Sequence, residues 1–179
     1  KGVTWNALSS SKTSARLSEN SIFDNAGSSL FPSKNISSEC IMAFINSKVM
    51  LKIFPLISPS LNYQPGEIAK LPGKFDDLLQ EKINPLVIKM IELSNEDWDD
   101  YETSWGFKRN QLISAESKSL SVKKSYDILR KKWQNNVNEL ISLELRNNSI
   151  FIENYDLQDE IVEDIPISDI TLNCNPSYR

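Results

Sequence analysis

Residues 37–72 of this 179-residue chain read SSECIMAFINSKVMLKIFPLISPSLNYQPGEIAKLP, and we expect the other elements to pack around them. The first half is apolar on most sides, which is typical of a helix covered by other elements rather than along one stripe. We predict an apolar helix over 36–54 that Asn35 or Ser37 caps and Pro55 ends, because a proline pushes the preceding residue out of helical geometry. The second half carries a proline–glycine turn and predicts a short strand over 61–71 that returns along the helix.

The N-terminal residues 1–32 are rich in serine and poor in helix formers. Val3–Trp5, Ala15–Leu17 and Ile22–Phe23 lie between polar loops, and their residue types predict short strands. A sheet of so few strands is marginally stable alone. We therefore expect it to pack on the apolar helix or on sequence outside this chain.

Two later segments repeat apolar residues every three or four positions. The first seam is Phe75, Leu79, Ile83, Leu86, Met90 and Leu93, and the second is Val122, Tyr126, Leu129, Trp133, Val137 and Leu140. Such seams place one apolar stripe on each helix, and two stripes can bury each other. The pattern therefore predicts two long helices that pair in antiparallel fashion.

Several signals interrupt or extend this helical region. Pro85 lies inside the first seam, so we expect a kink there or a restart with Asn84 as cap. Ser94 with Asp97 resembles a helix-start box in the connection that follows. The second helix is expected to continue through the apolar residues 150–152.

The C-terminal residues carry weaker signals. Residues 167–172 predict a short strand, whereas 173–179 have no packing signal and are expected to fray. We therefore predict an α+β, predominantly helical protein. Its parts are a β-rich region at 1–73, a helical region at 74–165, and a short strand with a frayed tail at 166–179.

Length and composition fit one domain, or one domain with an appendage, since 40% of the 179 residues are hydrophobic. The chain begins at Lys1 without a methionine, and we expect it to be a segment of a longer protein. Cys40 and Cys174 show neither metal-ligand spacing nor a disulfide framework, and we expect a reduced, cytoplasmic setting. No apolar run approaches the length of a membrane span, and residues at the start of the sequence show no signal-peptide pattern.

Charge is unevenly distributed along the chain. The formal net charge is −4, which alone argues against nucleic-acid binding by bulk electrostatics. Residues 1–74 nevertheless contain eight Lys or Arg against four Asp or Glu. The first part is therefore basic and the remainder is acidic.

Several kinds of chemistry are excluded. The chain has no histidine, which removes every His-based triad and His-metal arrangement. No glycine-rich phosphate motif occurs, and the adjacent acidic pairs are typical of solvated surface rather than of acid–base machinery. Residues 175–178, Asn-Pro-Ser-Tyr, resemble the Asn-Pro-Pro-aromatic motif of amino-methylating DNA methyltransferases, but a serine replaces the second proline, and a chance match is the favoured interpretation. We predict no catalytic, cofactor-binding or metal-binding residue in this chain.

Polar and basic residues of the types that contact DNA occur in two places. The first is the loop Ser9–Lys12 with Arg16, followed along the chain by further lysines; the alternative is that these are ordinary solvated residues. The second is the connection between the long helices, where Lys108 and Arg109 lie beside an aromatic cluster over 98–107. Those aromatic residues can stack on bases or form a small core of their own. The candidate DNA-binding residues are Ser10, Ser11, Lys12, Arg16, Lys108 and Arg109.

An ordered string of motifs runs along nearly the whole chain. It comprises Asn46-Ser47-Lys48-Val49-Met50, residues 58–68, Leu71-Pro72, Glu92-Leu93-Ser94, Asp97-Trp98, Glu102-Thr103-Ser104-Trp105, Phe107-Lys108-Arg109, Ile150-Phe151-Ile152-Glu153, Leu157-Gln158-Asp159-Glu160 and residues 169–176. With these motifs the chain resembles the PglX-like adenine-specific DNA methyltransferases of BREX phage-defence systems. The helix and its return segment are similar, more loosely, to target-recognition domains of type I specificity subunits and of fused type II restriction-modification enzymes.

The resemblance implies a segment downstream of the methyltransferase core, at the end of a target-recognition-like domain and the start of a helical region. The parent enzyme would use S-adenosylmethionine and flip an adenine from double-stranded DNA, with this segment recognising or positioning the DNA. The alternative function is a helical protein-interaction scaffold that binds other components of the defence system. An independent hydrolase has only scattered carboxylates in its favour.

Overall fold

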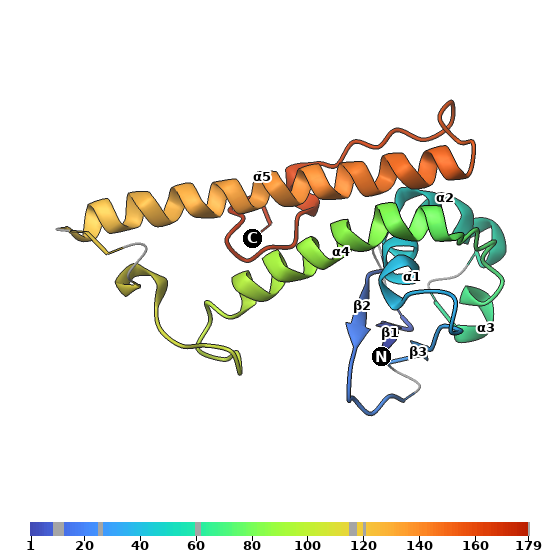
Figure 1. Ribbon diagram of the computed structural model, residues 1–179, viewed down its shortest axis with the longest axis horizontal. Helices are drawn as coiled ribbons and strands as arrows, with labels where there is room; N and C mark the ends of the chain where they lie inside the picture. Colours follow the sequence, from blue (N-terminus) through green and yellow to red (C-terminus); the bar gives the residue numbers. More distant parts are fainter. Residues whose placement is uncertain (9–12, 25–26, 60–61, 115–117, 120, 179) are drawn as a thin grey trace. The chain divides into compact units, whose positions relative to one another are not determined.

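The computed structural model describes residues 1–8, 13–24, 27–59, 62–114, 118–119 and 121–178. It confirms an α+β, mainly helical fold, with a three-stranded antiparallel sheet near the N-terminus followed by helices (Figure 1). The chain divides into two compact units. Unit 1 comprises residues 1–87 and 146–163, and unit 2 comprises residues 88–145 and 164–179.

The sheet of unit 1 is formed by β1 (Gly2–Trp5), β2 (Ala15–Ser18) and β3 (Ser29–Leu30) in the order β2-β1-β3. Its core residues are Val3 and Trp5, which are 0% and 1% exposed. The indole Nε1 of Trp5 donates a 2.7 Å hydrogen bond to the carbonyl oxygen of Tyr63. Two of the predicted strands are therefore confirmed; β1 packs into the interior, and β2 contributes the buried Ala15.

The strand predicted at Ile22–Phe23 is wrong. Both side chains are exposed and the backbone there is irregular, while the third strand forms at β3 instead. Phe23 contacts the ring of Phe31, with 5.3 Å between the ring centroids. Apolar residue type alone was the basis of the prediction, but strand formation also needs a partner for the backbone.

The single helix predicted over 36–54 is two helices, α1 (Ser38–Ile45) and α2 (Lys48–Ile57), bent by 72°. Ser37 caps α1 as expected, since its hydroxyl accepts the backbone N–H of Cys40 at 3.1 Å. The break occurs because Ser47 has extended geometry and caps a new helix, its hydroxyl accepting the backbone N–H of Met50 at 3.3 Å. A cap signal inside an apolar run overrides the periodicity around it.

Pro55 lies inside α2 rather than after its end. A proline costs a helix one backbone hydrogen bond and a clash with the preceding turn. α2 ends at Ile57, within a turn of the proline, and the N–H of Ser58 still bonds the carbonyl of Phe54 at 2.9 Å.

Over the described residues 62–71 the predicted return strand is wrong, because the segment contains the short helix α3 (Pro65–Ile68) instead; residue 61 lies outside the described residues. Pro65 stands at the first helical position, where its missing N–H costs nothing. Gln64 and Glu67 form a capping box around it. Pro65 is thus a helix-start signal rather than a turn signal.

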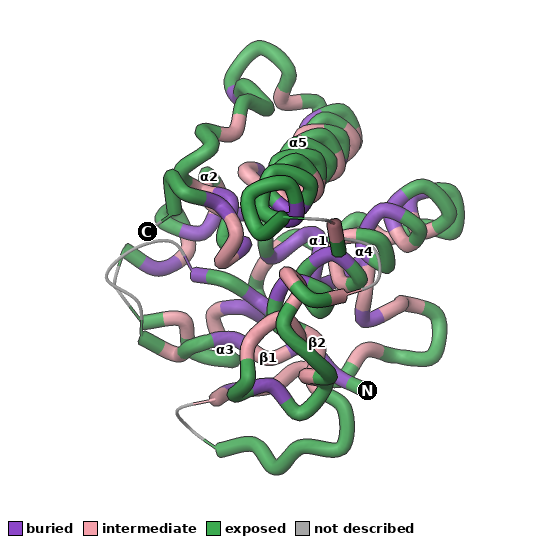
Figure 2. The backbone as a smooth tube through the Cα atoms, turned by 90° about the vertical axis from the view of Figure 1, so that its left-hand side faces the viewer, coloured by how far each residue is buried: buried purple, intermediate pink, exposed green. Residues whose placement is uncertain are grey.

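The apolar helix α1 is the centre of unit 1. Seven of its eight residues are buried, and Figure 2 colours α1 largely as buried. The ring of Phe44 lies 5.5 Å from Phe75, 5.6 Å from Phe151 and 5.5 Å from Tyr155, measured between centroids. The prediction of a helix covered on most sides is therefore confirmed for α1, although it ends at Ile45.

The two long helices are α4 (Asp77–Trp98) and α5 (Val122–Asn154), so the predicted extension through residues 150–152 is confirmed. The predicted restart at Pro85 is wrong, because α4 continues through it. Pro85 and Glu81, whose carbonyl loses its partner, are both exposed, so water can replace the missing bond.

The helix-start box predicted at Ser94 and Asp97 is also wrong, since both residues lie within α4. The hydroxyl of Ser94 donates to the carbonyl of Met90 at 2.9 Å, one turn earlier in the same helix. A cap requires extended backbone at the serine, and the surrounding apolar seam keeps the backbone helical instead.

In unit 2 the seams meet as predicted. Leu93 of α4 clusters with Val137 and Leu140 of α5, and Glu96 pairs with Lys132 at 2.5 Å. As the residue number increases along α4, the number of its partner on α5 decreases, which confirms antiparallel pairing within this unit. Val122 and Tyr126, by contrast, are 78% and 44% exposed, so the first turns of the second seam are not buried.

The C-terminal segment packs in this same core rather than forming the predicted strand. It contains a 3₁₀ turn at Ile167–Asp169, and Ile170 and Leu172 are buried in the cluster. A strand needs a neighbouring strand for its backbone groups, and here the backbone is bonded locally and by side chains.

Residues 173–175, predicted to be frayed, are fixed by two polar side chains. The carboxylate of Asp97 accepts the backbone N–H groups of Asn173 at 2.6 Å and Cys174 at 2.9 Å. The fully buried amide of Asn175 donates to the carbonyls of Ile167 and Ile170. Apolar periodicity carries no trace of such polar anchoring, which is why the sequence suggested fraying.

Candidate nucleic-acid interface

The motif Asn46-Ser47-Lys48 forms the joint between α1 and α2. Asn46 bonds the backbone of Ala15 on β2 through both ends of its amide, at 2.7 and 2.9 Å. The backbone N–H of Lys48 donates to Asn148 at 3.0 Å, and its ammonium donates to the carbonyl of Val162 at 3.1 Å. The motif thus joins a strand, two helices and a distant part of the chain, which is a structural task.

Arg16 lies on β2, one residue after the backbone that Asn46 holds, and its side chain is exposed. In the ladder it is opposite Thr4 of β1. The candidates Ser10, Ser11 and Lys12 lie outside the described residues. Among the candidates of this loop, the structure therefore positions Arg16, on a strand whose place is fixed.

Several other cations of residues 1–74 are already used inside unit 1. Lys1 pairs with Glu39 at 2.7 Å and Glu19 at 3.0 Å, and these hydrogen bonds raise the pKa of Lys1. Lys48 bonds a backbone carbonyl, and Lys74 bonds one too and lies 5.2 Å from the ring centroid of Tyr155. The basic excess of this region therefore overstates the charge that is available to a ligand.

Lys108 and Arg109 are exposed in the connection between α4 and α5, within unit 2. Nearby, Trp98 and Tyr101 stack with 6.3 Å between ring centroids, and Trp98 is 52% exposed. Trp105 is fully exposed. The two tryptophans are therefore not buried in a small core of their own, and the exposed indole of Trp105 can stack on a planar group. Arg16 belongs to unit 1, so the two groups of candidates lie in separate units.

A larger group of basic residues lies over 105–132, inside the part of the chain that is acidic on average. Residues 105–132 contain eight Lys or Arg and two Asp or Glu, whereas residues 75–104 contain two and nine. Four of these cations are exposed on the first turns of α5: Lys123, Lys124, Arg130 and Lys131. A sliding charge count would have found them, but they were averaged with acidic segments on both sides.

Unit 2 also contains a cavity of about 390 Å³ between the aromatic connection, α5 and the C-terminal segment. Its lining includes Asp97, Asp100, Gln111, Trp133 and Cys174. Burial raises the pKa of Asp100, and one of its carboxylate oxygens is buried without a partner.

Nucleophilic and metal chemistry have little support at this cavity. Burial raises the pKa of the Cys174 thiol to about 12, so the sulfur is held as a neutral thiol near pH 7. Within the described part of the chain, no group of three or more acidic or cysteine side chains is placed to hold a metal ion.

The Asn-Pro-Ser-Tyr segment at 175–178 does not present its asparagine to a ligand. The amide nitrogen of Asn175 is occupied by two carbonyls, and its oxygen accepts the N–H of Ser177 at 3.0 Å. The side chain is fully buried. A motif that holds a target amine needs a free amide, and this one is used as a tail anchor.

Over the described residues, no single helix is long and apolar enough to cross a bilayer, and only the bent pair α1–α2 passes by length and composition.

No family model matches the chain. Two curated proteins match it along nearly its whole length. An adenine-specific methyltransferase PglX from Lacticaseibacillus casei (strain Zhang) is 30% identical over 180 residues, which cover 96% of this chain and 14% of that protein. An adenine-specific methyltransferase BrxX from Escherichia coli O9:H4 (strain HS) is 32% identical over 182 residues, which cover 100% of this chain and 14% of that protein.

The chain therefore spans 14% of the length of the curated relatives it matches. Identity of this level over the full chain, in two proteins of the same printed activity, agrees with the motif string read from the sequence. The resemblance of this chain to the PglX-like adenine-specific methyltransferases is thereby confirmed.

Proposed function

We propose that this chain is a DNA-recognition or DNA-positioning segment of an adenine-specific DNA methyltransferase in a restriction or phage-defence system. In this proposal the segment has no catalytic activity of its own and lies downstream of the core. S-adenosylmethionine is bound, and the adenine is flipped, by residues elsewhere in the enzyme. The observation that carries the proposal is the match to two adenine-specific methyltransferases over 96% and 100% of the chain.

The described surface supports a DNA-facing role in two places. Arg16 is exposed on a strand that is fixed by Asn46, so a contact made there has a defined position. Lys108 and Arg109 are exposed beside the fully exposed Trp105. Arginine can bond a guanine edge or a phosphate in bidentate fashion, and lysine serves as a point charge for phosphates.

The test is duplex binding by the complete protein carrying Lys12→Ala and Arg16→Ala together. If this loop and strand read DNA, affinity for the recognised duplex should fall by about tenfold or more, because a lost bidentate base contact costs on the order of 1–3 kcal/mol. A matched variant with Lys52→Ala and Lys70→Ala removes two exposed cations of the same unit and should bind nearly as well as the wild type. Unchanged binding by the first variant would remove the loop from the interface, and absence of duplex binding by the wild type would overturn the function.

The second candidate function, a protein-interaction scaffold, is favoured by exposed apolar residues on the long helices. Leu78, Val122 and Ile128 are 70%, 78% and 46% exposed. An apolar partner contact should be weakly sensitive to salt, whereas DNA binding weakens steeply as salt rises. Measuring the complete protein's interactions at two salt concentrations separates the two functions.

A further inference from the structure

We propose that the first turns of α5 form a phosphate-contact face for duplex DNA, which supplies sequence-independent affinity from unit 2. The face consists of Lys123, Lys124, Arg130 and Lys131. This inference rests on the proposed function. In it, α5 provides affinity for DNA of any sequence, and the loop and strand of unit 1 read the bases.

Helical spacing places the four cations on one side of α5. Lys123 and Arg130 are seven residues apart, as are Lys124 and Lys131. Seven residues make nearly two turns, so each pair forms a row along the helix with about 10 Å between its members. The two rows lie side by side and together form a basic strip about two turns long.

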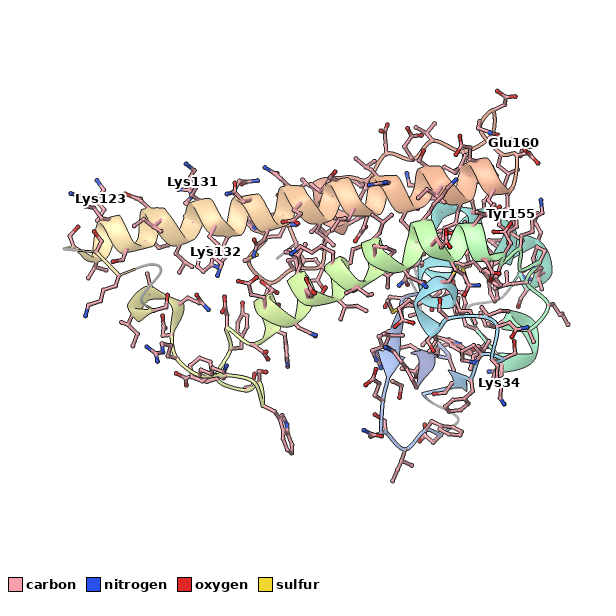
Figure 3. All side chains as sticks on the ribbon, in the orientation of Figure 1. Lys34, Lys123, Lys131, Lys132, Tyr155 and Glu160 are labelled. Carbon is pink, nitrogen blue, oxygen red and sulfur yellow. The ribbon has the colours of Figure 1, made fainter. Side chains whose placement is uncertain are left out.

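The strip faces away from the core of unit 2. All four residues are exposed, whereas Ser125 and Leu129 on the opposite side are buried. Figure 3 shows Lys123 and Lys131 on the side of α5 away from Lys132, which pairs with Glu96 of α4 at 2.5 Å. In Figure 2, where this end of α5 faces the viewer, the helix is mostly coloured as exposed.

The charges of the strip are not neutralised within the described residues. None of the four side chains forms an ion pair or a side-chain hydrogen bond in the part of the chain that the structure covers. Asp127 is the one acidic residue between the rows, and the described contacts do not pair it with them. The strip therefore keeps a net charge of about three, on a protein whose total charge is −4.

Long, exposed cations of this kind match phosphates better than base edges. Specific reading of a base needs side chains held in fixed positions, and phosphate contact needs only charge within reach. Binding of Lys and Arg to duplex DNA releases condensed counterions, which gives affinity without sequence preference. The cations of unit 1 offer less of this, because Lys1, Lys48 and Lys74 are already bonded inside that unit.

The test is the triple variant Lys123→Gln, Lys124→Gln and Lys131→Gln in the complete protein. Its binding to the recognised duplex and to an unrelated duplex is measured over a range of salt concentrations. Three lost phosphate contacts should lower the slope of log affinity against log salt by about 2–3, with a similar loss of affinity for both duplexes. The matched control is Lys34→Gln, Lys52→Gln and Lys70→Gln, which removes three exposed charges of unit 1 and should change the slope by less than one.

The outcomes separate the inference from the function on which it rests. If the wild type binds the duplex and the α5 triple variant binds it equally well at every salt concentration, the inference is wrong but the proposed function stands. An equal loss in both triple variants would also overturn it, because the effect would then follow total charge. No duplex binding by the wild type would overturn the proposed function. If DNA binding is unchanged but binding to a poly-glutamate peptide is lost, the face belongs to an acidic protein partner and the inference is wrong. The variant Lys123→Arg, Lys124→Arg and Lys131→Arg should bind DNA like the wild type.

Discussion

The side-chain amide of Asn46 and the backbone of Ala15 are joined by two hydrogen bonds. The N–H of Ala15 donates to the amide oxygen at 2.7 Å, and the amide nitrogen donates to the carbonyl of Ala15 at 2.9 Å. Asn46 thus completes the edge of β2 in the way that a neighbouring strand would, at the residue before Arg16. The Asn-Ser-Lys motif is explained by this joint rather than by contact with a ligand.

Replacing Asn46 by Asp should destabilise unit 1. The carboxylate keeps the acceptor for the N–H of Ala15 but faces its carbonyl oxygen without a donor. We expect a loss of about 1–2 kcal/mol in the free energy of unfolding, because one bond disappears and an oxygen is left against another oxygen. Urea unfolding at neutral pH measures this loss.

The matched control is Asn95→Asp, on the exposed surface of α4, where the change should be within about 0.5 kcal/mol. Equal stability of the two variants would mean that the Asn46 bonds contribute nothing to the fold. If Arg16 contacts DNA, Asn46→Asp should also weaken duplex binding by the complete protein more than Asn95→Asp does.

Phe44 should be the most costly side chain to remove from α1. It is 2% exposed and its ring contacts Phe75, Phe151 and Tyr155. Phe44→Ala should lower the free energy of unfolding by about 3–5 kcal/mol, because the transfer free energy of the ring is lost and the cavity left at a well-packed site adds a further cost. Leu56→Ala, at an 84% exposed position of α2, is the control and should cost less than about 0.5 kcal/mol. Thermal or urea unfolding of both variants distinguishes these expectations, and similar values would contradict the assignment of α1 as the core helix.

The elements that were predicted correctly are those with long and unambiguous apolar patterns. The seams of α4 and α5 span many turns, so a single proline or cap-like residue could not reverse them. The buried helix α1 was also evident from its composition. The predictions that failed concern short segments, where a single residue decides the structure: Ser47 divides the apolar helix, and Pro65 begins a helix where a strand was expected.

The candidate site was predictable only in part, for a different reason. Exposure of Lys108 and Arg109 follows from their place in a connection, and it agrees with the sequence interpretation. The use of Lys1, Lys48 and Lys74 inside unit 1 depends on contacts between residues far apart in sequence, such as Lys48 with Val162. Charge counts treat such cations as free, so they favoured unit 1 and missed the start of α5.

Asp97 is expected to hold the C-terminal segment of unit 2 in place. Its carboxylate is 6% exposed and accepts the N–H groups of Asn173 and Cys174. Asp97→Ala should lower the free energy of unfolding by about 2–3 kcal/mol, since two backbone N–H donors lose a charged acceptor. In a Cys40→Ala background, Cys174 should then be alkylated faster than in the parent at the same pH.

A control for this experiment is Glu92→Ala, which removes only a surface pair with Lys89 at 3.5 Å and should leave the alkylation rate unchanged. If Asp97→Ala unfolds the chain, Asp97→Asn provides a second variant, because the amide oxygen retains an acceptor at reduced strength. An alkylation rate that is the same in all variants would mean that Asp97 does not anchor the segment.

Stability should fall in alkaline solution because burial raises the pKa of two thiols, those of the buried Cys40 and the half-buried Cys174. The pKa of Cys40 is raised from 9.0 to about 12, mainly by burial and secondly by the negative charge of Asp76. The pKa of Cys174 is raised from 9.0 to about 12, mainly by burial and secondly by the hydrogen bond with Asp97. Between these values the unfolded chain releases protons that the folded chain retains, so stability is complete below pH about 9 and decreases as the pH rises toward 12. Each thiol can contribute at most about 1.4 kcal/mol per pH unit. Urea unfolding at pH 8, 9 and 10 should therefore show a decline that the Cys40→Ala, Cys174→Ala double variant largely lacks. Equal declines in the two proteins would assign the alkaline loss to other groups, with Tyr155 the first candidate because burial raises its pKa as well.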